Sequence, residues 1–546
     1  MSEFSEILNN VGEFGAFQKR LLVLICIPYL FTGFHILAQV FTGATVQHHC
    51  QANWILNITD ELSKEEQLLL TIPKEQDGSY QKCKMYTPHP DKDINWILLQ
   101  GNKSTIACEE GWVYDLSQHR STIVTEFNLV CDHRWLSQFS QTSTMAGLLA
   151  GALLFGPLAD RFGRQRSILV SLLLQFITGV GAAFVPNVSL FIVLQFVLGT
   201  SVSGIMMNTI VLGTEWTGVA HRSYPSVLTQ CCFSGGQVLL AGLAYGIRDW
   251  RMLQLTTSCP MVIFLSYIWL LPESARWLIT KGQKEAAKEY LRRAAIMNRR
   301  AINESLIDKA TVKEIKQITF WDLFRISSLR RVTLVLTYIW SVNSFVYYGL
   351  CLSVGSFGKN IYLTNFIFGL VEILRFSCIW FLARFGRKKC QGCFLLLGGV
   401  ACLLILTFPE GMALEVTVLA VLAKLSISCS FSVTYVYSTE LFPTVIRQTG
   451  IGFASMFARL GGTIVPLIMI LEQDYPGISL TLFGITSIIA SAVSLLLPET
   501  ANEELPDHTG QLGNVKKEVN GKSDVENSCP QSATDAEGNF TRSTRM

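Results

Sequence analysis

The stretch Asp160-Arg161-Phe162-Gly163-Arg164 closes one apolar run, and Arg384-Phe385-Gly386-Arg387-Lys388 closes another in the second half of the chain. In both, a glycine permits a tight turn, and the flanking arginines can reach helix C-termini and carboxylates on neighbouring helices. Two further landmarks recur at nearly the same spacing: Glu215 and Arg222 with Glu440 and Arg447, and Pro272-Glu273-Ser274 with Pro498-Glu499-Thr500. Recurrence of three landmarks at one spacing of about 225 residues indicates a duplicated unit.

Lipid rather than water solvates most of this chain. Half of its 546 residues are hydrophobic and only 16% are charged, whereas soluble domains carry about 25% charged residues. A spanning helix needs roughly 20 mostly apolar residues. We therefore predict an all-α polytopic membrane protein with twelve transmembrane helices in two six-helix pseudo-repeats. The apolar runs lie at 21–43, 139–159, 167–185, 189–212, 224–246, 252–271, 332–352, 361–383, 391–408, 415–437, 450–471 and 479–497.

The polar stretches divide the chain into segments. We expect no cleavable signal peptide, because the first apolar run follows a polar start and is too long for one. The tail is rich in Asn, Ser, Asp, Glu and Lys and is predicted to be disordered. The segments are an N-terminus 1–20, a first half 21–271 that includes the long loop 44–138, a linker 272–331 with short helices, a second half 332–497 and a tail 498–546.

Basic residues predict the orientation, because cytoplasmic loops carry an excess of Lys and Arg. Segment 273–331 holds fourteen Lys or Arg against seven Asp or Glu, and the two repeated turns are also basic. Short loops near 186–188, 409–414 and 472–478 hold no Lys or Arg. We therefore expect both termini and the linker in the cytoplasm and the loop 44–138 outside, with the chain in the plasma membrane.

The long loop has the chemistry of a secreted segment. Two disulfides are expected in an oxidising compartment, with three connectivities open. A zinc site is the alternative, which the lack of a Cys-x-x-Cys pair in the loop disfavours. Asn57 and Asn102 are glycosylation acceptors, which also need the secretory side. The four cysteines are Cys50, Cys83, Cys108 and Cys131.

The repeated turns resemble the signature loops of the major facilitator superfamily. The stretches 273–278, 440–447 and 126–132 resemble the solute carrier 22 family of organic cation, carnitine and organic anion transporters. The resemblance covers about residues 10–500. It implies the major facilitator fold, a substrate site between two halves that rock about it, and exchange against an intracellular anion.

The repeated turns also predict a cytoplasmic latch that holds in one state and releases in the other. The alternative is that these arginines only set topology. The latch candidates are Asp160, Arg161, Gly163, Arg164, Glu215, Arg222, Arg384, Gly386, Arg387, Glu440 and Arg447.

Four ionisable residues stand well inside apolar runs, where such residues are costly and mark function: Glu372, Arg375, Lys424 and Arg459. Three cations against one carboxylate leave a positive surplus, which selects anions. By resemblance, cation carriers typically have an aspartate in the eleventh helix and anion carriers an arginine, so Arg459 matches the anion branch, as do Arg375 and Lys424 at their positions. Guanidinium groups suit carboxylates. The alternative is that Arg459 and Arg375 are structural ion-pair partners.

Apolar and aromatic walls are expected around the substrate as well. For each aromatic residue, packing against a neighbouring helix or lipid is an equal alternative. For His35 the alternative is an interhelical hydrogen bond. The candidates are Tyr347, Tyr348, Phe233, Phe431, Tyr435, Asn208 and His35.

We predict a secondary active transporter of small organic anions such as urate, nicotinate or other aromatic or dicarboxylate anions. The runs 236–246 and 435–443 look most like the urate and nicotinate exchangers. A carnitine, cation or zwitterion carrier of the same fold is one alternative, and a non-transporting receptor is another. No nucleophile–base set or ATP-binding loop is apparent, so neither an enzyme nor a cofactor is expected. The expected partners are a substrate anion, a counter-anion, the bilayer and scaffold contacts of the tail; the net charge of +3 gives no support for nucleic acid.

Overall fold

The computed structural model describes residues 3–56, 62–75, 78–88, 104–117, 120–218, 221, 223–300, 322–357, 360–409, 412–442, 447–472 and 474–500. Several expectations lie outside these residues. They are the glycosylation acceptors Asn57 and Asn102, the latch candidate Arg222, the linker segment 301–321 and the tail 501–546.

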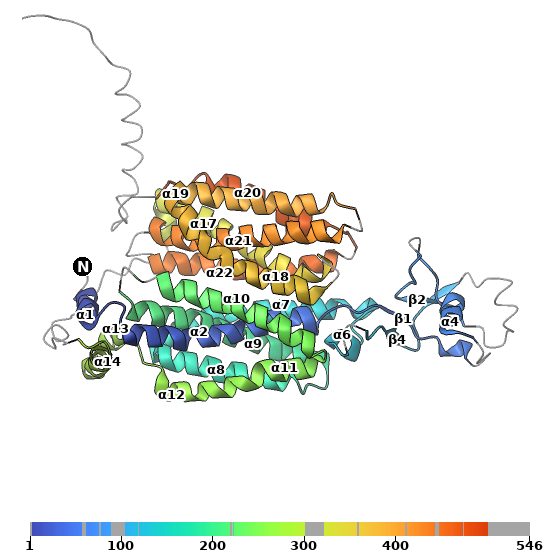
Figure 1. Cartoon of the computed structure of the whole chain (residues 1–546), viewed down its shortest axis with the longest axis horizontal. Coiled ribbons are helices and arrows are strands. Elements are labelled where there is room, and N and C mark those ends of the chain that lie inside the picture. Colours follow the sequence, from blue (N-terminus) through green and yellow to red (C-terminus); the bar gives the residue numbers. More distant parts are fainter. Residues whose placement is uncertain are drawn as a thin grey trace, which may run out of the picture.

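The first half forms the lower layer of the helical bundle in Figure 1, in blue to green. Its spans follow the apolar runs of the sequence, and small residues let α7 and α9 approach closely. The helices are α2 (Ala16–Leu37) with α3 (Gln39–Thr42), α7 (Trp135–Phe162), α8 (Arg164–Ala182), α9 (Val188–Trp216), α10 (Ser223–Gly246) and α11 (Trp250–Ser258), which continues through a 3-10 helix (Cys259–Ser266) into α12 (Tyr267–Leu270).

The second half forms the upper layer, in yellow to red (Figure 1). Across both layers, ten described helical segments are long and apolar enough to cross a membrane, and α18 and α23 are shorter apolar helices at the eighth and twelfth expected positions. The helices are α17 (Ser327–Leu352), followed by a 3-10 turn (Ser353–Ser356), α18 (Ile361–Ile373), α19 (Cys378–Phe385), α20 (Arg387–Ile405), α21 (Ala413–Leu441), α22 (Arg447–Leu471) and α23 (Ile478–Ser494).

The eighth span departs from the expected single helix over 361–383. It breaks into α18 and α19, joined by a 3-10 segment at Leu374–Ser377. Arg375 lies in this segment and Glu372 lies in the last turn of α18. Backbone geometry therefore changes where charged side chains enter the span, as is tolerated when such a segment is covered by protein.

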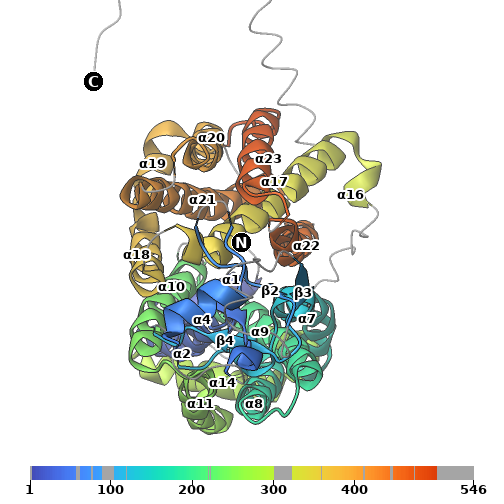
Figure 2. The same ribbon diagram turned by 90° about the vertical axis from the view of Figure 1, so that its right-hand side faces the viewer.

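Two helix pairs join the halves. α10 packs against α18, and α7 packs against α22. Figure 2, which looks along the bundle, shows both pairs where the two arcs of helices meet. Arg134 and Asp474 add an ion pair of 3.1 Å between the halves, and the rings of Phe41 and Tyr362 stack at 5.5 Å.

One end of the bundle carries the long loop and is called the disulfide end. The loop extends beyond the helices on the right of Figure 1. Its strands form two antiparallel pairs, β1 with β4 and β2 with β3. Disulfides join Cys50 to Cys108 and Cys83 to Cys131. The loop elements are β1 (His48–Cys50), a 3-10 turn (Asn53–Ile55), α4 (Lys64–Thr71), β2 (Lys84–Tyr86), β3 (Thr105–Ala107), β4 (Trp112–Tyr114), α6 (Ile123–Glu126) and a 3-10 turn (Cys131–His133).

The opposite end carries the turns at Gly163 and Gly386 and is called the basic end. Short helices of the linker region lie there, beside the N-terminal helix (Figure 1). Asn298 connects them, because its side chain accepts a hydrogen bond from Phe17 N and donates one to Val11 O. The short helices there are α1 (Glu3–Val11), α13 (Ala275–Thr280) and α14 (Lys284–Met297), whereas α16 (Asp322–Arg325) packs against α17.

Candidate functional site

The carboxylate of Glu372 joins two of the three cations predicted from sequence. Its Oε1 lies 2.8 Å from Lys424 Nζ and its Oε2 lies 3.1 Å from Arg375 Nη2. The side chains of Glu372 and Lys424 are fully buried. Burying charges costs several kcal/mol per ion unless each charge is paired and hydrogen-bonded. Both cations are therefore engaged by the protein itself.

The ammonium of Lys424 is already surrounded by protein groups, which leaves little room for a further anion. Beyond Glu372, its ammonium lies 2.7 Å from Cys351 Sγ and 3.2 Å from the centroid of the Tyr347 ring. A cation over an aromatic face in a desolvated place is stabilised by about 2 kcal/mol. Tyr347 thus covers Lys424, and its ring is itself buried.

Arg375 reaches across to the first half. Its Nη1 donates to Gln230 Oε1 at 2.9 Å, and its Nη2 donates to Ser234 Oγ at 3.1 Å. Ser234 in turn donates to Glu372 Oε2 at 2.6 Å. Because Gln230 and Ser234 belong to α10, the Glu372 cluster is a polar contact between the two halves.

Arg459 stands apart from this cluster. It lies near the middle of α22 and keeps partial exposure. Within the described parts of the chain, no carboxylate lies at ion-pair distance from it. Its electrostatic neighbours are the phenol groups of Tyr435, Tyr348 and Tyr29. Tyr29 belongs to α2, so groups from both halves surround this cation.

The predicted aromatic residues of α17 and α21 form one contiguous group between the Glu372 cluster and Arg459. Tyr347 and Tyr348 are edge to face at 5.3 Å, and Tyr347 lies 6.1 Å from Phe431. Trp340 contacts Phe431 at 5.5 Å and Tyr435 at 4.5 Å. Tyr348, Phe431 and Tyr435 remain partly exposed, so they can offer ring surface to a small aromatic solute.

His35 and Asn208 make their hydrogen bonds within the first half, whereas Phe233 belongs to the same buried apolar cluster as Tyr347. His35 lies within the first half, where its ring nitrogens contact Phe31 O at 2.8 Å and Ser258 Oγ at 3.1 Å. Ser258 belongs to α11, so this contact is the interhelical hydrogen bond considered as the alternative for His35, whereas Phe31 lies in the same helix as His35. Asn208 donates to Gly204 O of its own helix. The backbone of Phe233 packs against Gly33 of α2.

At the basic end, the first half contains a compact charge cluster. Arg164 Nη2 lies 2.9 Å from Asp160 Oδ1 and 3.3 Å from Glu215 Oε1. The amide of Arg164 donates to Glu273 Oε1 at 2.9 Å. Burial raises the pKa of Glu273 above its usual value, although its backbone donors and Arg164 oppose this. Gly163 makes the turn with φ of 104°, a backbone conformation that favours glycine.

The second half repeats this cluster. Arg387 donates to Glu440 through Nε at 3.0 Å and Nη2 at 2.9 Å. The amide of Arg387 donates to Glu499 Oε1 at 2.8 Å, and Gly386 makes the turn with φ of 84°. Each cluster joins helices of its own half. Arg161 and Arg384 are exposed, and the Arg447 side chain lies outside the described residues.

Sequence reasoning missed several groups near the cations. Gln230, Ser234, Trp340 and Cys351 are uncharged, and Tyr29 follows Pro28 in an ordinary apolar run. Uncharged residues carry no periodic or charge signal of their own. Ser234 could most easily have been predicted, because it directly follows Phe233, which was predicted.

Comparisons with known proteins agree with this geometry. A family model described as sugar (and other) transporter matches residues 104–509. Solute carrier family 22 member 13 of Homo sapiens is 42% identical over 510 residues, which cover 93% of this chain and 92% of that protein. Organic anion transporter 3 of Oryctolagus cuniculus is 38% identical over 531 residues, 94% of each chain. The xylose transporter XylE from E. coli, in a partially occluded inward-open conformation, shares the fold with a TM-score of 0.61 at 18% identity and covers 89% of this chain and 99% of its own. The chain therefore belongs to solute carrier family 22, a family of multi-pass membrane transporters with the major facilitator fold.

Proposed function

We propose that this chain carries small organic anions across the plasma membrane by alternating access, in exchange for an intracellular anion. Its substrates would be urate, nicotinate or other aromatic or dicarboxylate anions. Both termini would lie in the cytoplasm and the disulfide end outside. Support for this orientation comes from the basic residues at one end of the bundle and the two disulfides at the other.

The proposal rests on the surroundings of Arg459. The apolar runs of the second half contain three cations and one carboxylate, and the carboxylate of Glu372 pairs with Arg375 and Lys424. Arg459 is left with phenol neighbours and partial exposure. A guanidinium in a low-dielectric place with no paired carboxylate favours an incoming anion, which it can hold through two parallel hydrogen bonds.

The relatives support the same substrate class, since one of them is named organic anion transporter 3. A carnitine or cation carrier would need a carboxylate free to receive a positive charge. Glu372 already contacts Lys424, Arg375 and Ser234, so it does not fill that role. Membership of a transporter family favours transport over the receptor alternative.

The test is uptake by the purified full chain in proteoliposomes. Labelled nicotinate, urate and carnitine are offered separately, with and without unlabelled anion inside. Replacing Arg459 with Asp removes one charge-assisted hydrogen-bonding group, which contributes about 1.5–3 kcal/mol. We expect uptake of the transported anion to fall about tenfold or more, and internal anion to accelerate uptake by the unaltered chain.

The control is Arg293→Gln on α14, whose side chain is 66% exposed and remote from the candidate site. This variant should transport as the unaltered chain does. Anion uptake that survives Arg459→Asp, or uptake of carnitine alone, would contradict the anion proposal. If uptake does not depend on the internal anion, the chain carries its substrate without exchanging it for another anion, and the exchange part of the proposal is wrong.

A further inference from the structure

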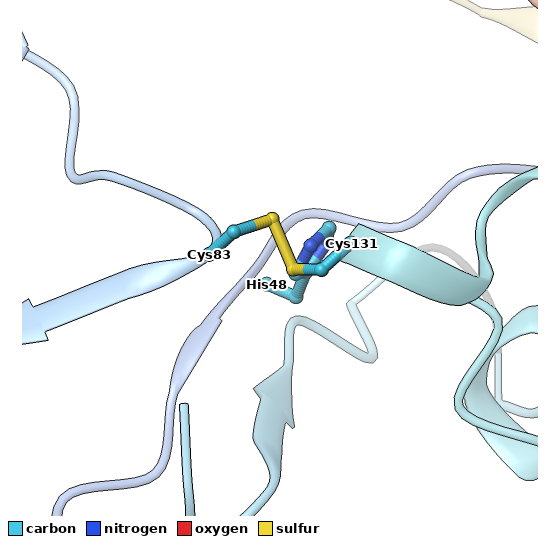
Figure 3. A group of neighbouring side chains, drawn as sticks. All are labelled: His48, Cys83 and Cys131. Carbon is cyan, nitrogen blue, oxygen red and sulfur yellow. A yellow bond between two sulfur atoms is a disulfide. The ribbon is translucent and has the colours of Figure 1, made fainter. Parts of the chain in front are cut away.

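His48 of β1 lies beside the disulfide that joins Cys83 to Cys131 (Figure 3). A ring nitrogen of His48 and the two sulfur atoms all lie within 4.8 Å of one another. In the oxidised form the sulfur atoms are bonded to each other and cannot act as thiolate ligands. We propose that reduction of this disulfide turns His48, Cys83 and Cys131 into a binding site for a thiophilic divalent cation of the zinc class.

His48 is already held in the form of a metal ligand. Its Nδ1 lies 2.9 Å from Val46 O, and a carbonyl can only accept, so Nδ1 carries the proton. Nε2 then has a free lone pair, and it is buried with no hydrogen-bond partner among the described residues. Histidines that bind metals usually donate their other N–H to a carbonyl or carboxylate in this way.

Strand pairing holds the imidazole in position. His48 stands opposite Tyr114 in the β1–β4 pair, and their ring centroids are 5.9 Å apart. His49, the next residue along the strand, points to the other face. The imidazole beside the disulfide is therefore fixed by the fold, and His49 offers a natural comparison.

The backbone spacing of the two cysteines suits a shared metal. Their Cα atoms are 5.6 Å apart. Zinc–sulfur bonds of about 2.3 Å in tetrahedral geometry place two sulfurs about 3.8 Å from each other, so the sulfurs need only separate after the bond opens. Two thiolates and one imidazole leave a fourth position for water, which is a common zinc arrangement.

A dithiol or phosphine reductant supplies two electrons, the sulfur–sulfur bond breaks, and each sulfur takes up one proton. A divalent cation then displaces both protons and binds two thiolates. The disulfide is accessible to the reductant, because Cys83 and Cys131 are both partly exposed.

Metal binding would restore the cross-link between Cys83 and Cys131 that reduction removes. The disulfide connects the start of β2 to the 3-10 turn at Cys131–His133, which leads directly into α7. Lys82 is a positive group beside this place and an electrostatic neighbour of His48. Its side chain is exposed, so water and salt screen its repulsion of a cation.

The test uses the purified full chain in nanodiscs, oxidised or reduced with a phosphine. Zinc binding is titrated against a chromophoric chelator, and cobalt is used to detect thiolate charge-transfer absorption. We expect the reduced chain to bind one more zinc than the Cys83→Ser/Cys131→Ser variant, and the oxidised chain to lack this zinc. His48→Gln should weaken that zinc by about tenfold or more, while His49→Gln should not.

A second readout is protease cleavage of the long loop. Reduction should speed cleavage, and zinc should slow it again in the unaltered chain and in His49→Gln but not in His48→Gln. His48→Gln keeps both disulfides in the oxidised form, so a folding defect is seen before any metal is added. Equal zinc affinity in His48→Gln, no zinc beyond the double serine variant, or equal binding by the oxidised chain would each overturn the proposal.

Discussion

Glu273 and Glu499 receive the same hydrogen bond at equivalent places in the two halves. Each accepts from the amide of the arginine that follows a left-handed glycine, Arg164 at 2.9 Å and Arg387 at 2.8 Å. The two carboxylates are separated along the sequence by nearly the same interval as the two turns. The duplicated sequence thus produces a duplicated contact. In each half it connects helices of that half at the basic end.

The pair Arg387–Glu440 should show energetic coupling. Two donor atoms of Arg387 hydrogen-bond to Glu440, and the side chains are only 23% and 18% exposed, so solvent screens the pair less than a surface pair. We expect a coupling energy of about 1–3 kcal/mol. The measurement is a double-mutant cycle with Arg387→Gln and Glu440→Gln, read by thermal unfolding in nanodiscs. Arg384→Gln in the cycle with Glu440→Gln is the control, and coupling of similar size there would contradict a specific pair.

Loss of Lys424 should destabilise the chain more than loss of an exposed lysine. Lys424→Met leaves Glu372 buried with one cation fewer, and breaking a buried pair costs about 3–5 kcal/mol. Because Arg375 still contacts Glu372, the lower end of that range is expected. Glu372→Gln should destabilise the chain at least as much, because it leaves both Lys424 and Arg375 without their carboxylate. The measurement is the unfolding temperature, with exposed Lys281→Met as the control; a loss in Lys424→Met no larger than that in Lys281→Met would contradict the pairing.

The sequence predicted the charges of the second half but not how they pair. Glu372 and Arg375 are three residues apart and can share a helix face, and in the structure they form an ion pair of 3.1 Å. Lys424 lies on another helix, and its choice of Glu372 depends on how α18 and α21 pack. Nothing in a single sequence states that packing, nor the 3-10 segment that redirects Arg375.

The same limit applies to the rest of the molecule. The fold class and the family were predicted from the repeated turns and are confirmed. Gln230 and Ser234 were missed because neutral polar residues in an apolar run look like ordinary packing. The four loop cysteines allowed three pairings, and the structure has Cys50 with Cys108 and Cys83 with Cys131. Pairing of this kind is fixed by tertiary contacts that spacing alone does not encode.

The contact between the long loop and α11 should weaken in acid. Glu126 Oε1 accepts from Arg251 Nε at 2.9 Å, and its Oε2 accepts from Trp250 Nε1 at 2.6 Å. Burial acts to raise the pKa of Glu126, but these hydrogen bonds and the charge of Arg251 outweigh it, so the pKa lies below its usual value. A lowered pKa in the folded state contributes stability above the unfolded value of about 4.3, and this is lost as pH falls further.

The measurement for Glu126 is the unfolding temperature in nanodiscs from neutral pH down to about pH 3.5. The difference between the unaltered chain and Glu126→Gln should be constant above about pH 5 and should shrink below about pH 4, where the carboxyl takes up a proton. Exposed Glu109→Gln is the control. A difference that grows in acid would have the opposite sign and would contradict a lowered pKa.

Gly147 of α7 should tolerate no side chain. A Cβ added there would collide with the backbone of Phe196 on α9, and one added at Gly199 would collide with the backbone of Thr144. Backbone atoms cannot rotate away, so the two helices would have to separate. Overpacking of this kind costs about 1–3 kcal/mol, and small residues at crossings are what allow such close packing in membranes. Gly147→Ala should therefore lower the unfolding temperature and the yield of monodisperse protein.

The matched control for Gly147 is Gly242 of α10, which lies inside a spanning helix with nothing near its Cβ position. Gly242→Ala should be neutral or slightly stabilising, since alanine favours helix over glycine by up to about 1 kcal/mol. Both substitutions add the same methyl group inside a spanning helix, so helix propensity acts similarly on the two. Equal effects on the unfolding temperature would mean that propensity, rather than the α7–α9 crossing, sets the outcome.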